Sequence, residues 1–322
     1  MGKWIEEHEQ DKKTRCECRN GKNSRKGDGM AQEKLVYRLE QLAQDHELPF
    51  FIQYGRHDND LVQHRHEDFT ELTIVLSGEA THVVGEERLP VRKGDVFVIQ
   101  QDTIHGFEQV HNFRICNIMF QDTFFPLKEW DIGNMAGFHA LFYVEPGYSQ
   151  NHHFVSHLHL EEDSFVQVEN MIRKMVKEYK KRESGWKTNL LAYFLELVVL
   201  LARCYSTQTK EQENHEVMAL ARTAAWLEQH LQEEISVQML AERADYSMRH
   251  FTRLFQQTYH MSPIEYLNSL RLEQACRLLR DTDLSVVDVA MQCGYRNSSY
   301  FHRIFLRQMK ISPGKYRKKW KE

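Results

Sequence analysis

The sequence predicts a multi-domain α+β protein, in which a β-rich N-terminal half precedes an all-helical C-terminal half. Three observations predict this class. The chain has 322 residues, more than a single domain usually contains. Short strand-like runs with turn signals between them fill residues 50–120. One helix-turn-helix pattern occurs twice after residue 235.

Residues 50–120 are expected to form a barrel or jelly roll. Their alternating or apolar runs are short, at Glu71–Leu76, Thr81–Val84 and Val96–Gln100. Turn signals separate these runs at Ser77-Gly78, at Val84-Gly85-Glu86 and at Lys93-Gly94-Asp95. Strands of this length and spacing are typical of barrels and double-sheet folds. We assign residues 30–160 to this domain and expect a helix near its start, at Glu33–Gln44.

Two helices are predicted after the barrel, within residues 161–214. Phe165–Lys181 places its apolar residues on one face at helical spacing. Leu190–Tyr205 is apolar nearly all round, contains two charges, and is shorter than the roughly 20 residues of a membrane span. We therefore expect a buried helix or a dimer contact, and no membrane partner. The polar stretch Ser206–His215 is expected to be an interdomain linker.

The C-terminal domain, residues 215–322, contains one pattern twice, at 236–258 and 285–309. Six residues of the first copy recur 50 positions later, with Phe251, Arg253, Phe255, Ser262, Pro263 and Tyr266 returning as Phe301, Arg303, Phe305, Ser312, Pro313 and Tyr316. The earlier part of each copy is offset by 49, so the second copy has one more residue in its turn. Each copy has the form helix, sharp turn, helix, by which many proteins place a helix in a DNA groove.

The residues in the turn of each copy can be explained by the backbone conformation that the turn needs. Gly294 is expected in the left-handed conformation, which glycine adopts without steric cost. Asp245 holds the matching position in the first copy, and aspartate is among the few other residues that tolerate it. Ser247 and Asn297 are the expected N-caps of the second helices.

The second helix of each copy leaves a polar face outward, and we expect these faces to touch DNA. Arginine suits base edges and phosphates, and short polar side chains suit the same contacts. For any one of these residues a solvated helix face is an equally good explanation, but the repeated turn and core residues favour DNA. The predicted DNA-binding set is Arg249, Thr252, Arg253, Asn297, Ser298, Ser299, Tyr300, His302 and Arg303.

The charge distribution agrees with this prediction. Residues 215–322 contain sixteen Lys and Arg against twelve Asp and Glu, a net charge of +4. The whole chain has a net charge of −4, so residues 1–214 carry about −8. Basic charge is therefore concentrated in the half that contains the helices, as phosphate binding requires.

The repeat resembles the DNA-binding domain of AraC-type bacterial transcription regulators, over about a hundred residues from near His215 to Trp320. Its most specific parts are Ala241-x3-Asp245-Tyr246-Ser247, Ser262-Pro263-x2-Tyr266, Ala290-x3-Gly294-Tyr295 and Phe305-x6-Ser312-Pro313-x2-Tyr316-Arg317. The resemblance implies that a long helix, Pro263–Arg280, joins two units whose recognition helices enter successive major grooves. It also implies a cytoplasmic homodimer that binds a DNA operator and, as an activator, RNA polymerase.

The N-terminal half is similar to the cupin barrels over about 70 residues. The first cupin motif corresponds to His64-x-His66-x4-Glu71-x6-Gly78, and the second to Gly94-x10-His105. In metal-binding cupins the ligands come from the positions of His64, His66, Glu71 and His105. Three imidazoles and one carboxylate suit a divalent transition metal. The second motif departs from the pattern at Gln100, Asp102 and Gln109, which weakens the prediction of a metal more than that of the barrel.

Three interpretations of these four residues remain open: a metal site, a small-molecule pocket, and partly buried polar residues without a role. Beside an AraC-type domain the barrel looks like an effector sensor, so we favour the pocket and predict no cofactor. The runs at 94–105 and 112–118 are similar to sugar-responsive members, the rhamnose regulators especially. We therefore expect a ligand-responsive regulator of carbohydrate-related genes, not an enzyme. The alternative is a metal-dependent cupin dioxygenase or isomerase fused to a DNA-binding tail.

Residues 1–29 are charged and contain no apolar run, so they are not a signal peptide. We expect a disordered tail, or a true start at Met30. Cys16-x-Cys18 has no second pair nearby, so we do not predict a metal there. The remaining cysteines lie in apolar contexts and are expected to be free thiols, which fits a reducing cytoplasm. No phosphate-binding glycine loop or nucleophile elbow occurs in the sequence.

Overall fold

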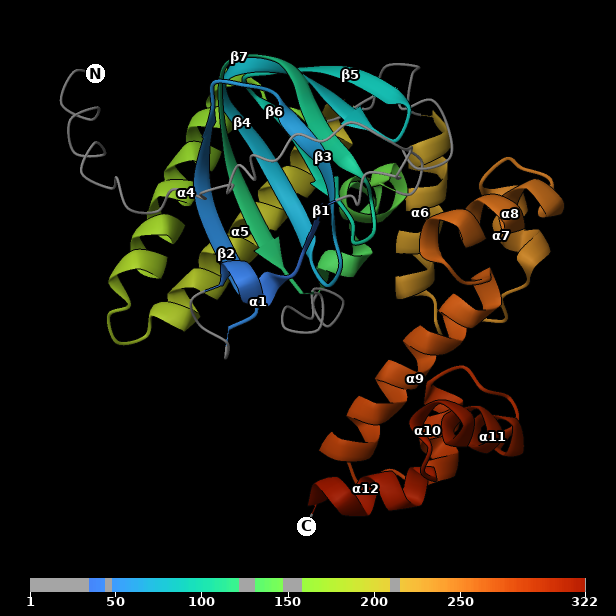
Figure 1. Cartoon of the computed structure of the whole chain (residues 1–322). Helices are drawn as coiled ribbons and strands as arrows, with labels where there is room; N and C mark the ends of the chain where they lie inside the picture. Colours follow the sequence, from blue (N-terminus) through green and yellow to red (C-terminus); the bar gives the residue numbers. More distant parts are fainter. Residues whose placement is uncertain (1–34, 44–47, 122–130, 147–157, 209–214, 322) are drawn as a thin grey trace, which may run out of the picture. The chain divides into compact units, whose positions relative to one another are not determined.

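The computed structural model describes residues 35–43, 48–121, 131–146, 158–208 and 215–321. It confirms a mixed α+β protein in which one sheet precedes a series of helices (Figure 1). The predicted tail and Cys16-x-Cys18 lie outside the described residues. Among these residues the strands are β1 (Leu35–Tyr37), β2 (Phe50–His57), β3 (Leu61–His66), β4 (Thr70–Val84), β5 (Glu87–Arg92), β6 (Asp95–Ile99), β7 (His105–Phe120) and β8 (Leu158–His159).

The two longest strands, β4 and β7, organise the sheet. Its order is β1-β3-β7-β4-β6-β8, with β2 also paired to β7 and β5 also paired to β4. Successive residues of a strand face opposite sides, so each long strand contributes to two cores. Val75 of β4 belongs to a cluster enclosed by the strands, whereas Leu72 and Ile74 pack in the core that includes the helices.

One predicted turn in the barrel is wrong. Ser77-Gly78 lies inside β4, which continues from Thr70 to Val84. The pairing with β7 shifts register between Val75 and Thr81, so the glycine marks a bulge. Gly78 has a φ of +76°, and a Cβ there would lie 2.3 Å from the Asn112 carbonyl oxygen. Glycine is required in a bulge for the same reason as in a turn, so the sequence does not distinguish them.

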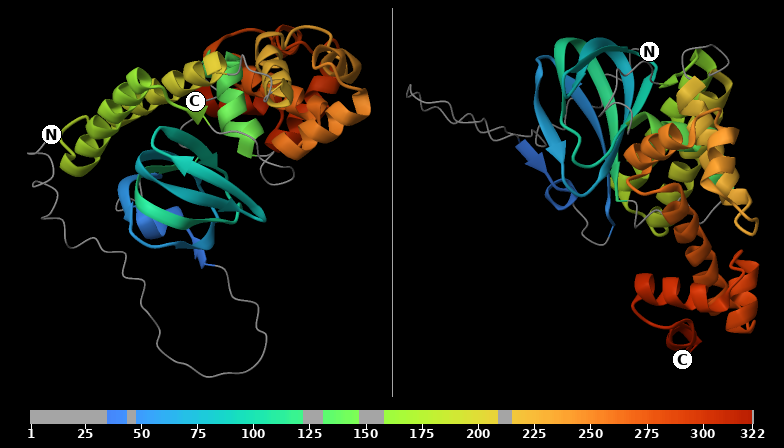
Figure 2. Two further views of the ribbon diagram at one scale, coloured as in Figure 1. Left: turned by 90° about the horizontal axis from the view of Figure 1, so that it is seen from above. Right: turned by 90° about the vertical axis from the view of Figure 1, so that its right-hand side faces the viewer.

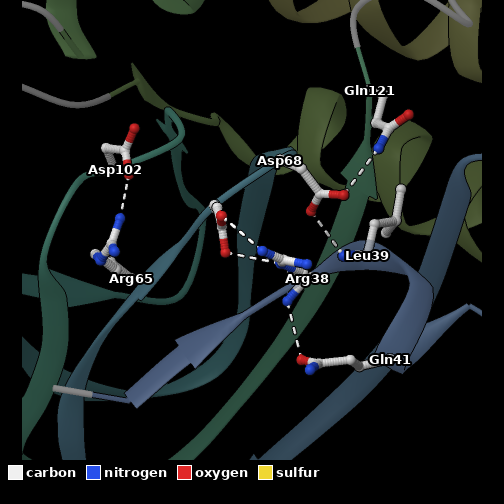
Figure 3. A network of polar contacts seen from close by, with 8 residues as sticks. Arg38, Leu39, Gln41, Arg65, Asp68, Asp102 and Gln121 are labelled. Atoms are coloured by element: carbon white, nitrogen blue, oxygen red, sulfur yellow. Dashed lines mark hydrogen bonds and ion pairs between the residues drawn. The ribbon is translucent and has the colours of Figure 1, made fainter. Parts of the chain in front are cut away.

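The helix expected at Glu33–Gln44 is also wrong in its described part. Leu35–Tyr37 is a strand paired in parallel with β3, and only Leu39–Leu42 (α1) is helical. Figure 3 shows the contacts that hold this segment: Asp68 accepts from the Leu39 N–H at 2.8 Å and from the Gln121 side-chain amide at 3.1 Å. Such tertiary contacts override the weak helical propensity of a short segment.

Two long helices, α4 (Glu162–Lys181) and α5 (Trp186–Gln208), lie side by side against the sheet (Figures 1 and 2). α5 has 23 residues, so the prediction of a helix too short to cross a membrane is wrong; it is the one described helix that is long and apolar enough. However, Leu190, Phe194 and Leu197 are fully buried in the core shared with the sheet. A core helix of this composition passes the same length test, and the burial favours that assignment.

The C-terminal part contains two helix-turn-helix units and a joining helix, as predicted. The helices are α6 (His215–Gln229), α7 (Val237–Arg243), α8 (Met248–Tyr259), α9 (Pro263–Asp281), α10 (Val286–Gln292), α11 (Ser298–Met309) and α12 (Pro313–Lys321). The first unit is α7–α8, the second is α10–α11, and α9 joins them. Ser262 caps α9 in a capping box with Glu265, and Pro263 occupies its first turn.

The sequence analysis did not predict the short helical segment between the sheet and α4. It consists of η3 (Asp131–Asn134), α2 (Ala136–His139) and the π-helix η4 (Ala140–Val144), and it continues in helical form to Pro146. Gly137 packs so closely on α5 that a Cβ would lie 1.9 Å from the Ala202 carbonyl oxygen. The segment is therefore fixed against the long helices of the N-terminal half.

Candidate nucleic-acid interface and barrel site

The turn of each helix-turn-helix unit has the predicted geometry. Asp245 and Gly294 both have positive φ, of 58° and 79°. The Ser247 side chain accepts from the His250 N–H at 3.3 Å. The Asn297 side chain accepts from the Ser299 and Tyr300 N–H groups at 2.8 and 3.0 Å. Both expected N-caps are thus confirmed, and they determine which residues of α8 and α11 face outward.

The outward face of α8 presents the arginines that the sequence predicts. Phe251 and Phe255 are fully buried, which leaves Arg249 and Arg253 exposed and Thr252 half-buried. All three line one shallow surface hollow, together with Val237, Met248, Gln256 and Gln257. The Thr252 hydroxyl donates to the Met248 carbonyl at 2.8 Å, so its oxygen is left to accept from a partner.

The outward face of α11 is built differently. Phe301 and Phe305 are buried, and the six predicted residues of this unit are all exposed: Asn297, Ser298, Ser299, Tyr300, His302 and Arg303. The Arg303 guanidinium lies over the Tyr300 ring at 5.3 Å, which holds the charge on the helix surface. Asn297 uses its side-chain oxygen as the cap, so only its amide N–H groups are available to DNA.

Sequence reasoning missed Arg271, which ties the two units together from α9. Its guanidinium donates to the Leu231 and Glu233 carbonyls, both at 2.8 Å, in the loop before α7. It also lies 5.5 Å from the Tyr295 ring in the turn of the second unit. Burial lowers the pKa of Arg271 from its ordinary value. The three contacts fix how far the second turn lies from the first unit.

Inside the barrel the four predicted residues come together. His64 and His66 lie on β3, Glu71 on β4 and His105 at the start of β7. One ligand nitrogen from each histidine lies within 4.8 Å of the others. His66 Nε2 is 3.3 Å from His105 Nε2 and 3.3 Å from Glu71 Oε2. Ring nitrogens of three histidines from β3 and β7 therefore lie close together, and Glu71 of β4 meets this group at His66.

Burial favours the uncharged form of this cluster. It lowers the pKa of His66 to about 3 and that of His105 well below its ordinary value, and it raises the pKa of Glu71 to about 7. The Thr73 hydroxyl donates to Glu71 Oε1 at 3.0 Å. Among the described residues, His66 Nδ1 and His105 Nδ1 are buried without a hydrogen-bond partner. Neutral imidazoles can bind hydroxyl groups, and they are also the form that binds metals.

The spacing of the donor atoms fits a divalent metal ion. Zinc–nitrogen distances of about 2.0–2.1 Å in a tetrahedral site separate neighbouring donor atoms by about 3.4 Å. The two separations at His66 are both 3.3 Å. His64, His66 and His105 would hold the ion, and Glu71 lies beside them against His66. The same separations also fit a hydrogen-bonded network without metal, so both of the first two interpretations remain consistent with the geometry.

A small cavity lies beside this cluster, and sequence reasoning missed the residues that line it. They are His82, Val84, Phe97, Val98, Ile99, Gln100, Thr103 and Pro146, and none of the four predicted residues is among them. The His82 ring lies 5.7 Å from the His105 ring and stacks on Phe97 at 4.5 Å. The bulge at Gly78 breaks the strand alternation, so counting alternate residues from Glu71 does not place His82.

Comparison with known proteins agrees with both halves of the structure. A family described as "Helix-turn-helix domain" matches residues 240–319, and one described as "Cupin domain" matches residues 52–118. The transcriptional activator RhaS of Enterobacter sp. (strain 638) is 31% identical over 254 residues, covering 78% of this chain and 86% of that protein. The chain belongs to the AraC-type transcription regulators.

A second transcriptional activator and a solved AraC-type regulator are also similar to this chain. The transcriptional activator RhaR of Mannheimia succiniciproducens is 26% identical over 277 residues, covering 85% of this chain and 93% of that protein. A solved AraC-type regulator of Chromobacterium violaceum is 28% identical, with a TM-score of 0.29, and covers 31% of this chain and 88% of its own. This AraC-type regulator is therefore a DNA-binding transcription regulator, with a cupin domain before two helix-turn-helix units.

Proposed function

We propose that this regulator activates carbohydrate-related genes when a small effector binds in its barrel. We also propose that both recognition helices, α8 and α11, contact one operator; they are called the reading helices below. The observation that carries the proposal is the pair of exposed polar faces on α8 and α11, each set by a capped turn. Its relatives RhaS and RhaR are named transcriptional activators, which supports activation. An activator of this kind contacts RNA polymerase, and access to the chromosome requires the cytoplasm.

The DNA contacts are assigned to nine residues of the two reading helices. In the first unit Arg249 and Arg253 would reach bases or phosphates, and Thr252 would accept from a base amino group. In the second unit Arg303 has the base-reading role, because its guanidinium is exposed and held over Tyr300. The remaining contacts are assigned to Asn297, Ser298, Ser299, Tyr300 and His302.

The effector is proposed to be a small neutral molecule rich in hydroxyl groups. In the barrel cluster of His64, His66, Glu71 and His105, burial lowers the pKa of His66 and raises that of Glu71, and both shifts favour the uncharged form of the group. Neutral imidazoles and a carboxyl group offer donors and acceptors that suit hydroxyl groups. The names of the relatives make L-rhamnose the first compound to test.

A homodimer formed through α4 and α5 completes the proposal. α5 carries a stripe of half-buried apolar residues at helical spacing, Leu191, Leu195 and Val199, and Val166 of α4 is 44% exposed. These residues add apolar surface beyond the face that packs on the sheet. In sedimentation, replacement of Val166 and Val199 by glutamate should convert a dimer to a monomer. Monomeric behaviour of the unmodified protein would contradict this part of the proposal.

The convergence of the barrel donors favours a second candidate, in which the barrel is a metal centre. Metal analysis of the purified protein and of a His66→Ala variant separates the two. Near-stoichiometric metal that is lost in the variant would support the metal centre, and with it the alternative of a cupin enzyme. Absence of metal would leave the neutral pocket as the role of these residues.

Genomic footprinting with and without L-rhamnose tests the main proposal. We expect specific sites beside sugar-uptake or catabolic genes, with occupancy or transcription that changes on addition of one sugar. An Arg253→Ala variant expressed at the same level serves as the control and should lose most of these sites. Sites without a sugar response would remove the carbohydrate effector but retain the regulator. Absence of specific sites would contradict the proposal as a whole.

A further inference from the structure

The segment Ala136–Pro146 forms one wall of the barrel cavity. The Gln100 side-chain amide donates to the Phe142 carbonyl at 3.0 Å, and Gln100 lines the cavity together with Pro146. The segment is also held from the other side, because the Tyr205 hydroxyl of α5 donates to the buried Glu145 carboxylate at 2.5 Å. The opposite walls come from the paired strands β4 and β6.

The cavity is small in this structure. Its volume is about 20 Å³, enough for a single water molecule. The described residues that line it include no aspartate, glutamate, lysine or arginine, so it suits an uncharged occupant. An occupant larger than water has to move a wall. The strands are fixed by ladder hydrogen bonds, and Gly137 and Glu145 hold the two ends of the segment on α5. The π-helical turn between these two residues meets Gln100 only through a side-chain hydrogen bond, so this turn is the part of the wall that yields.

The opposite side of the same segment packs on the first reading helix. Tyr143 stacks on Tyr259, the last residue of α8, with ring centroids 5.9 Å apart and an interplanar angle of 25°. The His139 imidazole contacts the Tyr259 hydroxyl at 3.3 Å through Nδ1, while Nε2 lies 2.8 Å from the Gly133 carbonyl. The neutral tautomer with the proton on Nε2 satisfies both contacts, because Nδ1 then accepts from tyrosine.

The segment also contains a turn that is suited to a change of backbone conformation. Ala140–Val144 is a π-helix, a rare form that often occurs at functional sites in otherwise α-helical segments. Tyr143 and Phe142 both lie in this turn, so the residue that touches α8 is adjacent to the residue that Gln100 holds. A shift of the turn moves both contacts together.

The repeat provides an internal comparison for this contact. The position that matches Tyr259, 50 residues later, is Met309, which is 36% exposed. The preceding core residues, Phe255 and Phe305, are identical and fully buried. The first copy thus differs from the second at the residue that meets the segment, and a packing role common to both units does not explain the tyrosine.

We propose that the effector held by the barrel cluster extends past His82 into this adjacent cavity, and that segment 136–146 is the lid of the cavity. The lid passes cavity occupancy to α8 through Tyr143, His139 and Tyr259. The occupant is a small uncharged molecule that accepts the hydrogen bond which the Gln100 amide otherwise donates to the Phe142 carbonyl. Release of that carbonyl shifts the π-helical turn and loosens the C-terminal end of α8. This proposal rests on the proposed effector-responsive function and assigns its signal to the first reading helix.

Hydrogen–deuterium exchange of the full chain tests the relay without DNA or effector. Gln100→Met keeps the side-chain length but removes the donor to Phe142, so amides of α8 residues 255–259 should exchange about three- to tenfold faster. The matched residues 305–309 of α11 should not change. Gln53→Met, an exposed glutamine on β2, is the control and should leave both peptides unchanged. Unchanged exchange of α8 in Gln100→Met would overturn the proposal.

A second variant changes α8 and measures the effect on the segment. Tyr259→Phe removes the hydroxyl that contacts His139 and retains the ring, so exchange should rise in residues 136–146. This variant decides the matter if Gln100→Met fails to fold, and unchanged exchange in the segment would then overturn the relay. Failure of the footprinting experiment with positive exchange results would remove the regulatory function but keep the mechanical coupling, so the two failures are distinguishable.

Discussion

The two helix-turn-helix units share a pattern but differ in what supports them. The first unit belongs to one continuous core with α6, segment 131–146 and the long helices, whereas the second has a separate core with α9. Phe251 and Phe255 match Phe301 and Phe305 in position and burial. A shared pattern therefore specifies the DNA-reading form, and the residues outside the pattern determine which unit is connected to the barrel.

The largest expected effect comes from truncating the matched core residues. Phe255→Ala and Phe305→Ala should each lower the free energy of unfolding by about 3–5 kcal/mol, since both rings are fully buried. Their proteolysis patterns should differ: Phe305→Ala should expose cleavage sites only in the second unit, and Phe255→Ala should also expose segment 131–146. Identical patterns in the two variants would contradict separate cores.

The second largest effect is expected in the turns, because the two turns should differ in how well they tolerate substitution. Gly294→Ala should lower the free energy of unfolding by about 2–4 kcal/mol, because the left-handed backbone disfavours alanine and the added Cβ would lie 2.2 Å from the Leu231 carbonyl oxygen. Asp245→Gly should be neutral to within about 0.5 kcal/mol, since aspartate already adopts the positive φ. Urea denaturation measures both, and equal losses would show that the turns are not distinguished by this contact.

Sequence alone was sufficient for the part of the molecule that repeats. The doubled pattern located both reading helices, their caps and the joining helix, because each depends on residues close in the chain. The bulge at Gly78, the strand at Leu35–Tyr37 and the contact of Tyr143 with Tyr259 were not predictable, since each depends on partners distant in sequence. The barrel residues were found by resemblance, but the adjacent His82 and Gln100 needed the fold.

The reading arginines should have equal and separate effects on DNA binding. Arg253→Ala and Arg303→Ala should each weaken operator binding by about 1–3 kcal/mol without loss of stability, because both side chains are exposed. Titration of a labelled operator by fluorescence anisotropy measures this, with the unfolding curve as the control. If both variants bind like the parent protein, the reading faces are assigned wrongly.

The N-caps should give the smallest effect and separate stability from recognition. Ser247→Ala and Asn297→Ala should each lower the free energy of unfolding by about 1 kcal/mol, because each removes an accepted hydrogen bond at a helix start. Only Asn297→Ala should also weaken operator binding beyond its effect on stability, since Asn297 is assigned to the DNA contact. Equal binding by both variants would reduce Asn297 to a cap.

The most direct test of the account is a hydroxyl-radical footprint of the purified protein on one recovered operator, with and without L-rhamnose or another responsive sugar. The account predicts that each protomer protects two half-sites about one helical turn apart, of which Arg253→Ala weakens one and Arg303→Ala the other. Addition of the sugar should change protection mainly at the half-site lost in Arg253→Ala, because the lid contacts the first unit through Tyr259. Equal changes at both half-sites, or no protected sites, would contradict it.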